Sequence, residues 1–276
     1  MAKLTRKLWV GIGAATIAGA SVTGSAAAQH ATHKQQPNQQ APTPGGPATN
    51  TPSEGGEAYL TDGGPKDTRI RFYRDIELMR GHLLVGAQLI ELDLWDEALP
   101  HFLHPTEELY GLMEKYIKLH NIPPFDRDLR ALAQTVKAKR KGAFAQAQKE
   151  VDRRLDAALA AAKKFMTPVH NFTVRTAIEV LRVAQSEYEA SMEDGKFVKP
   201  VEYQDSRGFV LQAERMFEGA AGELARIDKD ALTRIRATLI QLKSAWPAPM
   251  PPNQPVLDAG AISALISDIE LHISRY

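Results

Sequence analysis

The sequence predicts an all-α protein, a multi-helix bundle built of antiparallel helical hairpins and preceded by a disordered N-terminal linker. Apolar residues recur three and four positions apart in most segments after residue 65, which is typical of amphipathic helices. No segment shows the period-two alternation of a half-buried strand. Proline and glycine interrupt the helical patterns at intervals, so the helices are expected to fold back on one another.

The first residues predict the compartment. A basic start over Lys3–Lys7 precedes an apolar stretch over 8–24, and Ala26–Ala28 offers small residues for cleavage. This order is typical of a secretory signal peptide, here over 1–28. We therefore expect a periplasmic or secreted protein without a membrane span after signal cleavage. An uncleaved anchor is the alternative, because the apolar stretch is close to the length that crosses a bilayer.

The composition changes after the signal segment. Residues 29–64 are rich in Gln, Pro, Thr, Gly and Ser and contain hardly any aliphatic side chain. Such a segment has too little apolar surface to fold, so a flexible linker is predicted. Residues 65–276 are assigned to one helical-bundle domain, with a candidate sub-boundary near residue 167, where Thr167-Pro168 interrupts the helical pattern.

Charge and cysteine content exclude several classes of protein. The formal net charge is +1, whereas a protein that binds nucleic acid needs a clustered basic face. The chain has no cysteine, so it cannot form disulfides, thiolate metal sites or a covalently attached c-type haem. Any metal ion must therefore be held by His, carboxylate, Met or Tyr side chains.

The first helix is expected to start after Asp67, a favourable N-cap residue. Its apolar residues form two adjacent rows, so the helix is apolar around much of its circumference and should lie at the centre of the bundle. The rows are Phe72, Ile76, Met79, Leu83, Ala87 and Ile90, and Leu78, His82, Val85 and Leu89. His82 therefore lies among aliphatic residues, either as a hydrogen-bonded core histidine or as a ligand.

A second helix is expected to begin at Trp95 and to pack closely on the first. Its spacing resembles that of a single tetratricopeptide unit, at Gly86, Leu89, Trp95, Ala98 and Phe102. The resemblance implies a tight helical hairpin, but no second copy follows, so a solenoid is not expected. Pro105 is predicted to break this helix and to start another, with His104 as the N-cap.

Further helices are predicted along the rest of the chain. Each predicted end is marked by proline, glycine or a capping aspartate. They cover about 126–141, 143–165, 174–194, 201–222, 228–242 and 262–269.

One stretch of the second half carries a recognisable pattern. Tyr188 ends a helix, Asp194-Gly195 forms a turn, and Glu202-Tyr203-Gln204-Asp205 opens the next helix. Residues from about 173 to 246 thereby resemble the periplasmic helical region of bacterial high-affinity iron permeases. The resemblance implies a periplasmic module of iron uptake with a membrane metal-transport component as its partner. The permeases' membrane motif Arg-Glu-Gly-Leu-Glu is absent from this chain, so transport itself is not implied.

A second, shorter resemblance lies in the first half. His104-Pro105-Thr106-Glu107 is similar to the His-x-x-Glu motif of imelysin-like periplasmic proteins, which are associated with iron or haem acquisition. This chain has Phe102 where that family has glycine, two residues before the histidine. The resemblance implies a role in iron or haem uptake.

Candidate metal ligands are concentrated between Gly81 and Tyr110 and at the helix start after Pro200. A transition-metal ion needs three or more converging nitrogen or oxygen donors, and Fe, Cu and Zn all accept imidazole. The candidate donors are His82, His101, His104, Glu107, Glu108, Glu202 and Asp205. The carboxylates also have a structural explanation, because the helix dipole favours acidic residues in a first turn.

No catalytic signature accompanies these residues. The sequence contains no nucleophile elbow, phosphate-binding loop or His-Glu-x-x-His zinc motif, so an enzyme is not expected. We interpret the chain as a secreted or periplasmic helical bundle that binds a metal ion or serves as an accessory module of iron or haem uptake. The alternative is a non-catalytic structural or protein-interaction bundle without a metal site.

Overall fold

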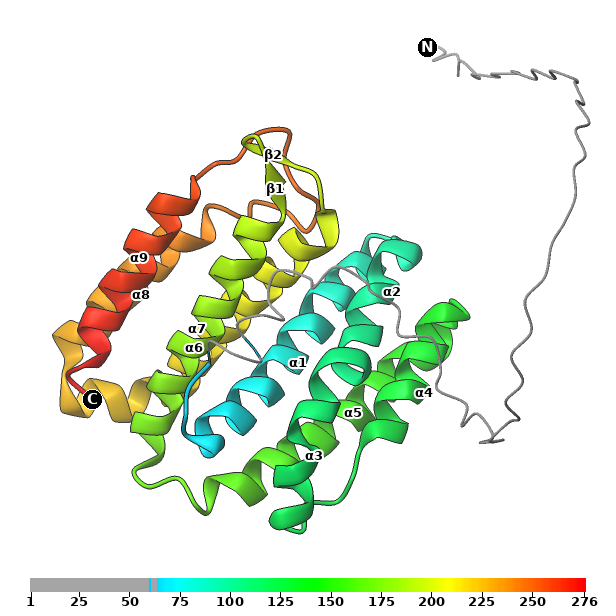
Figure 1. Cartoon of the computed structure of the whole chain (residues 1–276), viewed down its shortest axis with the longest axis horizontal. Coiled ribbons are helices and arrows are strands. Elements are labelled where there is room, and N and C mark those ends of the chain that lie inside the picture. Colours follow the sequence, from blue (N-terminus) through cyan, green and yellow to red (C-terminus); the bar gives the residue numbers. More distant parts are fainter. Residues whose placement is uncertain (1–59, 61–63) are drawn as a thin grey trace, which may run out of the picture. The chain divides into compact units, whose positions relative to one another are not determined.

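Helix α1 (Thr68–Glu91) runs through the middle of a helical bundle in the computed structural model, with other helices on either side of it (Figure 1). The structure describes Leu60 and residues 64–276. The signal peptide predicted over 1–28, and all of the linker predicted over 29–64 except Leu60 and Gly64, lie outside these residues. Across the described part, no helix combines the length and apolar character needed to cross a membrane.

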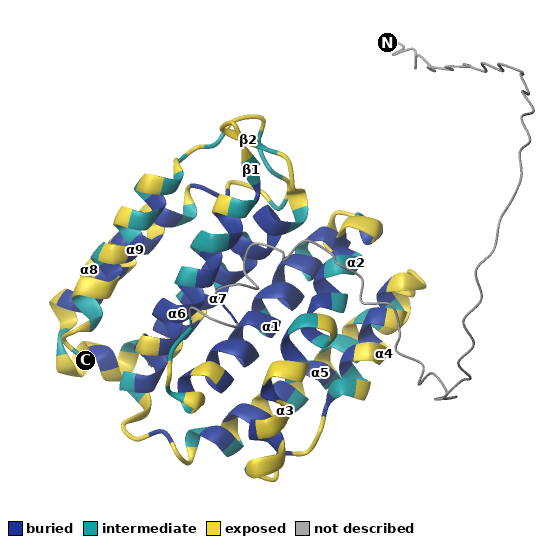
Figure 2. Ribbon diagram, viewed as in Figure 1, coloured by how far each residue is buried: buried dark blue, intermediate teal, exposed yellow. Residues whose placement is uncertain are grey.

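Helix α1 forms as predicted. The side chain of Asp67 caps it by accepting the Arg69 backbone N–H. Both predicted apolar rows are buried except for Ala87, and Figure 2 shows α1 as the most continuously buried helix of the bundle. Polar side chains are buried on the same helix at Arg74, Asp75, Glu77 and His82. A central helix therefore carries charged groups that need partners inside the protein.

The first half of the chain packs on one side of α1. Helix α2 folds back against α1 after a turn in which Asp93 has a positive φ of 62°, as the predicted hairpin requires. Helices α4 and α5 pack against each other, and α4 also packs on α2. The bounds are Trp95–His104 for α2, Pro105–Leu109 for the π-helical turn η2, Tyr110–Leu119 for α3, Asp126–Lys137 for α4 and Lys141–Lys163 for α5.

The break predicted at Pro105 is wrong. His104 has helical angles (φ −50°, ψ −42°) and makes no capping hydrogen bond with its side chain, so it is not an N-cap. A proline inside a helix lacks one N–H and displaces the preceding turn. The chain accommodates Pro105 with a wide π turn, closed by a hydrogen bond from the Tyr110 N–H to the Pro105 carbonyl. The backbone therefore stays helical from Trp95 to Leu119.

The second half packs on the other side of α1. Helices α6 and α7 pack against each other and against α1, while α8 and α9 form an outer pair on α7 and α6. Asp228 caps α8 as predicted, by accepting the Ala231 N–H. The bounds are Val169–Ala190 for α6, Pro200–Ile227 for α7, Lys229–Lys243 for α8 and Ala259–Ile273 for α9.

A small hairpin between α6 and α7 departs from the prediction. Helix α6 ends at Ala190, before the predicted stop at Asp194-Gly195. Those two residues have positive φ angles of 49° and 71° and form the turn between β1 (Met192–Glu193) and β2 (Lys196–Phe197). Two-residue turns of this kind match the twist of paired strands. Because each strand has two residues, the all-α class is confirmed for the described part.

Helices α1 and α7 cross with one glycine against another. A Cβ atom on Gly208 would collide with the carbonyl oxygen of Gly81, and one on Gly81 would lie 2.6 Å from Cδ1 of Phe209. The two backbones therefore approach more closely than side chains at these positions would allow. The crossing lies next to His82 in α1 and within one turn of Asp205 in α7, so it sets the distance between these two residues.

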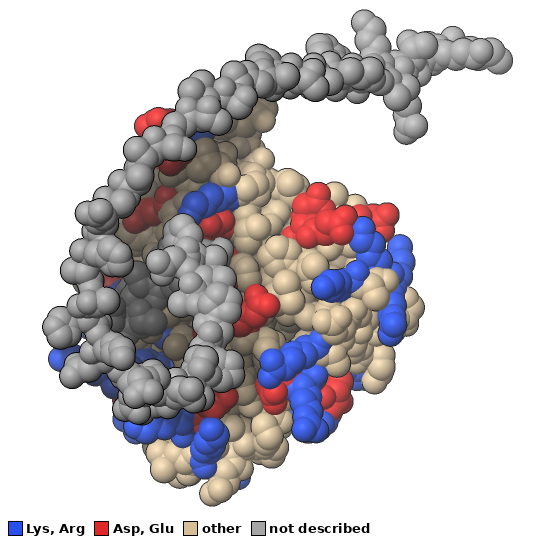
Figure 3. Space-filling view, turned by 45° about the vertical axis from the view of Figure 1, so that its right-hand side comes forward, with Lys and Arg blue, Asp and Glu red and all other residues tan. Residues whose placement is uncertain are grey.

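Charged side chains of both signs are interspersed on the face shown in Figure 3. The surface of the bundle also carries ion pairs, such as Arg80 with Asp156 at 2.6 Å and Lys139 with Asp96 at 2.8 Å. Exposed pairs of this kind contribute about 0–1 kcal/mol each, so the stability of the bundle comes mainly from its buried face.

Candidate metal centre

Asp205 lies at the centre of a buried cluster of histidines. Its Oδ1 atom lies 2.6 Å from Nδ1 of His82 and 2.7 Å from Nδ1 of His101, and its Oδ2 atom lies 3.2 Å from Nδ1 of His104. The four residues come from α1, α2 and α7, and none is more than 9% exposed. The fold therefore brings together four of the seven predicted ligands, from both halves of the sequence.

The packing of the helices explains this convergence. The Gly81–Gly208 crossing brings α1 and α7 together, and Phe209 holds the His82 ring edge-on at 4.8 Å between centroids. A similar contact involves α2. A Cβ atom on Gly86 would lie 3.3 Å from Cβ of His101, so the absence of a side chain at Gly86 lets α2 pack closely on α1. Small residues in α1 thus position histidines and carboxylate from three helices.

His101 is held through both of its ring nitrogens. Its Nε2 atom lies 2.9 Å from Oε1 of Gln204, and the amide nitrogen of Gln204 donates to Sδ of Met250 at 3.3 Å. The amide oxygen therefore faces His101 and accepts a hydrogen bond. Both ring nitrogens of His101 therefore lie within hydrogen-bonding distance of an oxygen atom, one from Asp205 and one from Gln204.

The charge of Asp205 is set by its neighbours. Burial alone raises the pKa of this carboxyl, but the attraction of His82 and His101 and the hydrogen bonds from His101 and His104 hold the pKa well below its usual range. Burial lowers the pKa of His82, against the attraction of Asp205. Asp205 is therefore a carboxylate surrounded by histidine N–H groups, and those protons occupy the positions that a cation would take.

One subset of the cluster has the spacing of a metal site. His82, His104 and Asp205 each offer one donor atom, and these three atoms lie within 4.8 Å of one another. Imidazole nitrogen and carboxylate oxygen are ligands for Fe, Zn and Cu, and two histidines with one carboxylate are a donor set that proteins use for ferrous iron. The residues present therefore fit a transition-metal ion.

The other predicted ligands lie at the edge of the cluster or outside it. Glu108 Oε1 lies 3.5 Å from Nε2 of His104. Glu202 is buried, and its Oε1 atom lies 3.3 Å from Nζ of Lys199. Glu107 is exposed on the π turn and is not among the residues that the fold brings together. The donors thus extend from Asp205 toward Glu108.

Glu187 is a carboxyl near the cluster that the sequence analysis did not select. Burial, followed by the negative charges of Asp205, Glu108 and Glu202, raises its pKa well above the ordinary value, while His104 opposes the shift. A signal was present in the sequence, because Glu187 lies seven residues after Val180 and three after Ala184, on the buried face of α6. A carboxyl on such a face needs either a proton or a cation.

Replacing Glu187 by glutamine is expected to stabilise the metal-free protein at neutral pH. The raised pKa means that the folded state holds its proton more tightly than the unfolded state, so the stability that the carboxyl provides below its ordinary pKa of 4.5 is lost as the pH rises. Glutamine is neutral at every pH and avoids this loss. Urea unfolding of both proteins at a series of pH values from about 4 to about 8 should show a stability difference that grows with pH. A difference independent of pH would contradict this account of Glu187.

Comparison with known proteins gives one match. Residues 169–276, which contain α6 to α9, match a family described as an iron permease-associated 4-helix bundle domain. The match confirms the predicted resemblance of the second half to an iron-permease helical region. No curated protein and no solved structure matches the chain. Asp205, Gln204 and Glu187 lie inside the matched segment, whereas His82, His101 and His104 lie before it.

Proposed function

We propose that this protein is a secreted or periplasmic, non-catalytic bundle that binds a transition-metal ion and serves as an accessory module of metal uptake, with iron as the leading cargo. The observation that carries the proposal is the burial of three histidines around the single carboxylate of Asp205. The match of residues 169–276 to an iron permease-associated domain supports iron and a membrane transport component as the partner.

The edge of the cluster supports exchange of a cargo ion rather than permanent burial. His104 and Glu108 have side chains 11% and 21% exposed, whereas His82 and His101 are almost completely enclosed. An ion entering past Glu108 and His104 would reach Asp205 through the most exposed of these side chains within the described part of the chain. Carboxylates near this edge, including Glu187, would favour a cation electrostatically.

The alternative function is a structural or interaction bundle in which the same residues form a hydrogen-bonded core. One observation favours it, since Asp205 and the three histidines already satisfy one another without a cation. Buried polar networks of this kind can fix a unique packing of helices. The two functions differ in whether the cluster of Asp205 and the three histidines binds a metal ion.

Metal titration separates the two functions. Purified protein titrated calorimetrically with Fe(II), Zn(II) and Cu(II) is expected to bind about one ion per chain at this cluster, the one group of suitable donors among the residues that the structure describes. The His82→Ala, His104→Ala double variant should lose this binding, whereas His272→Ala, on α9 near Asp268, should retain it. Titrations in two buffers of different ionisation enthalpy should reveal proton release, and affinity should fall as the pH falls.

Two outcomes would contradict the metal proposal. They are no saturable binding of any of the three ions, and binding that survives the double variant. The second would mean that the ion attaches elsewhere in the chain.

A further inference from the structure

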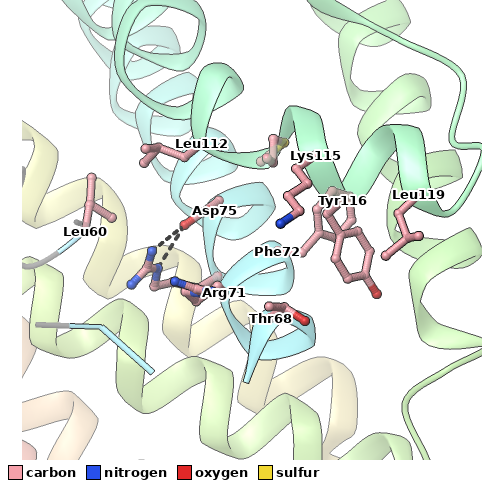
Figure 4. Close-up of a pocket in the computed structure, with 11 residues that line it drawn as sticks. Leu60, Thr68, Arg71, Phe72, Asp75, Leu112, Lys115, Tyr116 and Leu119 are labelled. Atoms are coloured by element: carbon pink, nitrogen blue, oxygen red, sulfur yellow. Dashed lines mark hydrogen bonds and ion pairs between the residues drawn. The ribbon is translucent and has the colours of Figure 1, made fainter. Parts of the chain in front are cut away.

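A cavity of about 360 Å³ lies between α1 and α3 (Figure 4). It is lined by the first two turns of α1, whereas His82 lies in the second half of that helix. Its volume is in the range of pockets that hold small molecules. None of its lining residues belongs to the histidine cluster, so whatever it binds is separate from the candidate metal.

A buried arginine in the wall of this cavity is incompletely satisfied. Arg74 is 1% exposed, and its Nε and Nη2 atoms contact Oδ1 of Asp75 at 2.9 and 2.8 Å. Its Nη1 atom is also buried and has no hydrogen-bond partner within the described residues. A buried donor without an acceptor is costly, so this nitrogen is the first indication of a missing ligand oxygen.

The charges around the cavity indicate the sign of that ligand. Arg71 and Lys115 line it together with Arg74, and the carboxyl of Asp75 is the one acidic group among the described residues of the lining. Neither Arg71 nor Lys115 forms an ion pair with a carboxylate of the described part, and Figure 4 shows Lys115 extending from α3 toward α1. The lining therefore carries an excess of positive charge.

The rest of the lining is apolar. Phe72 and Tyr116 stack with their ring centroids 4.3 Å apart, and Leu60, Leu112 and Leu119 complete the wall. Leu112 and Leu119 are 45% and 70% exposed, so apolar surface remains at the rim. The cavity thus combines an excess of positive charge with uncovered apolar side chains.

We propose that this cavity binds a small amphipathic carboxylate, with its oxygens on Arg74 and between Arg71 and Lys115 and its apolar part against Phe72 and Leu119. Guanidinium and carboxylate groups match in shape and charge, and their hydrogen bonds are stronger than those between neutral groups. A purely apolar ligand would leave Nη1 of Arg74 unsatisfied, and a purely ionic one would leave the leucines exposed.

The probe is octanoate, titrated into the purified protein by calorimetry. Saturable binding is expected for octanoate, with binding at least about tenfold weaker for octanol, which lacks the charge, and for acetate, which lacks the chain. Vesicles containing phosphatidylglycerol distinguish a lipid surface from a free carboxylate, and the protein should not sediment with them. Equal binding of octanol, or vesicle binding without octanoate binding, would overturn the proposal.

Substitutions locate the site. Arg71→Gln and Lys115→Gln change exposed side chains, and each should weaken octanoate binding by about tenfold without changing the thermal midpoint of the free protein. Lys118→Gln, which removes an exposed cation paired with Glu114 on the same helix, is the control and should bind octanoate normally. Arg74→Met combined with Asp75→Asn removes the buried pair together and should abolish binding. If all of these variants bind octanoate as tightly as the wild type does, octanoate binds at another place on the protein.

Discussion

Replacement of Gly208 by alanine is expected to destabilise the protein, although alanine is the better helix former. The new Cβ atom would collide with the carbonyl oxygen of Gly81, a backbone atom that cannot move without displacing α1. Overpacking of this kind typically costs about 1–3 kcal/mol in the free energy of unfolding. The gain in helix propensity, about 1 kcal/mol, is at most equal to the lower end of that range.

The same helix offers a matched control. Gly219 lies in α7 with no atom within 4 Å of the position that a Cβ would occupy. Gly219→Ala should therefore stabilise the protein by about 1 kcal/mol, and the two variants should differ by the overpacking cost of about 1–3 kcal/mol in urea unfolding. If Gly208→Ala is as stable as Gly219→Ala, the close crossing of α1 and α7 does not occur in solution.

The crossing also connects packing with the candidate metal centre. A separation of α1 from α7 would lengthen the 2.6 Å contact between His82 and Asp205. Metal affinity should consequently fall in Gly208→Ala and remain unchanged in Gly219→Ala. Neither substitution touches a donor atom, so such a loss would show that the site depends on the approach of the two helices.

Much of the fold was predictable from local chemistry. Asp67 and Asp228 were identified as N-caps because each is a short acidic side chain before a segment whose apolar residues have helical spacing. Both side chains accept the expected backbone N–H. Errors occurred where two local tendencies compete. At Pro105 a helix break and a π turn both accommodate the missing N–H, and this chain adopts the π turn.

The candidate site was predictable in residue type but less so in arrangement. The three histidines and Asp205 were selected because nitrogen and oxygen donors cluster in the sequence, yet nothing local fixes which face of α7 meets α1. That contact depends on Gly208, whose role appears only when the opposing Gly81 is known. Glu187 and Gln204 were missed because one carboxyl or amide on a buried helical face gives a weak signal without its distant partners.

Asp205→Ala is expected to have the largest effect on stability of any single substitution in the cluster. The carboxylate is buried and accepts from His82, His101 and His104, so its removal leaves three buried imidazoles without their common acceptor. Loss of one partner from a buried charged network costs about 3–5 kcal/mol. Asp156→Ala is the matched control, because its 2.6 Å pair with Arg80 is similarly short but its side chain is 71% exposed. That control should lose at most about 1 kcal/mol.

The pH dependence of this difference has a definite sign. The histidines hold the folded pKa of Asp205 well below the ordinary value of 3.8, so the folded state releases this proton more readily than the unfolded state. The stabilisation is therefore present above pH 3.8 and is lost as the pH falls toward the folded pKa. Urea unfolding should show that the difference in the free energy of unfolding between wild type and Asp205→Ala narrows in acid, whereas the difference for Asp156→Ala should stay small at every pH.

An Asp205→Ala protein as stable as Asp156→Ala at neutral pH would show that the histidines do not need this carboxylate. The electrostatic case for a cation site between them would then be lost.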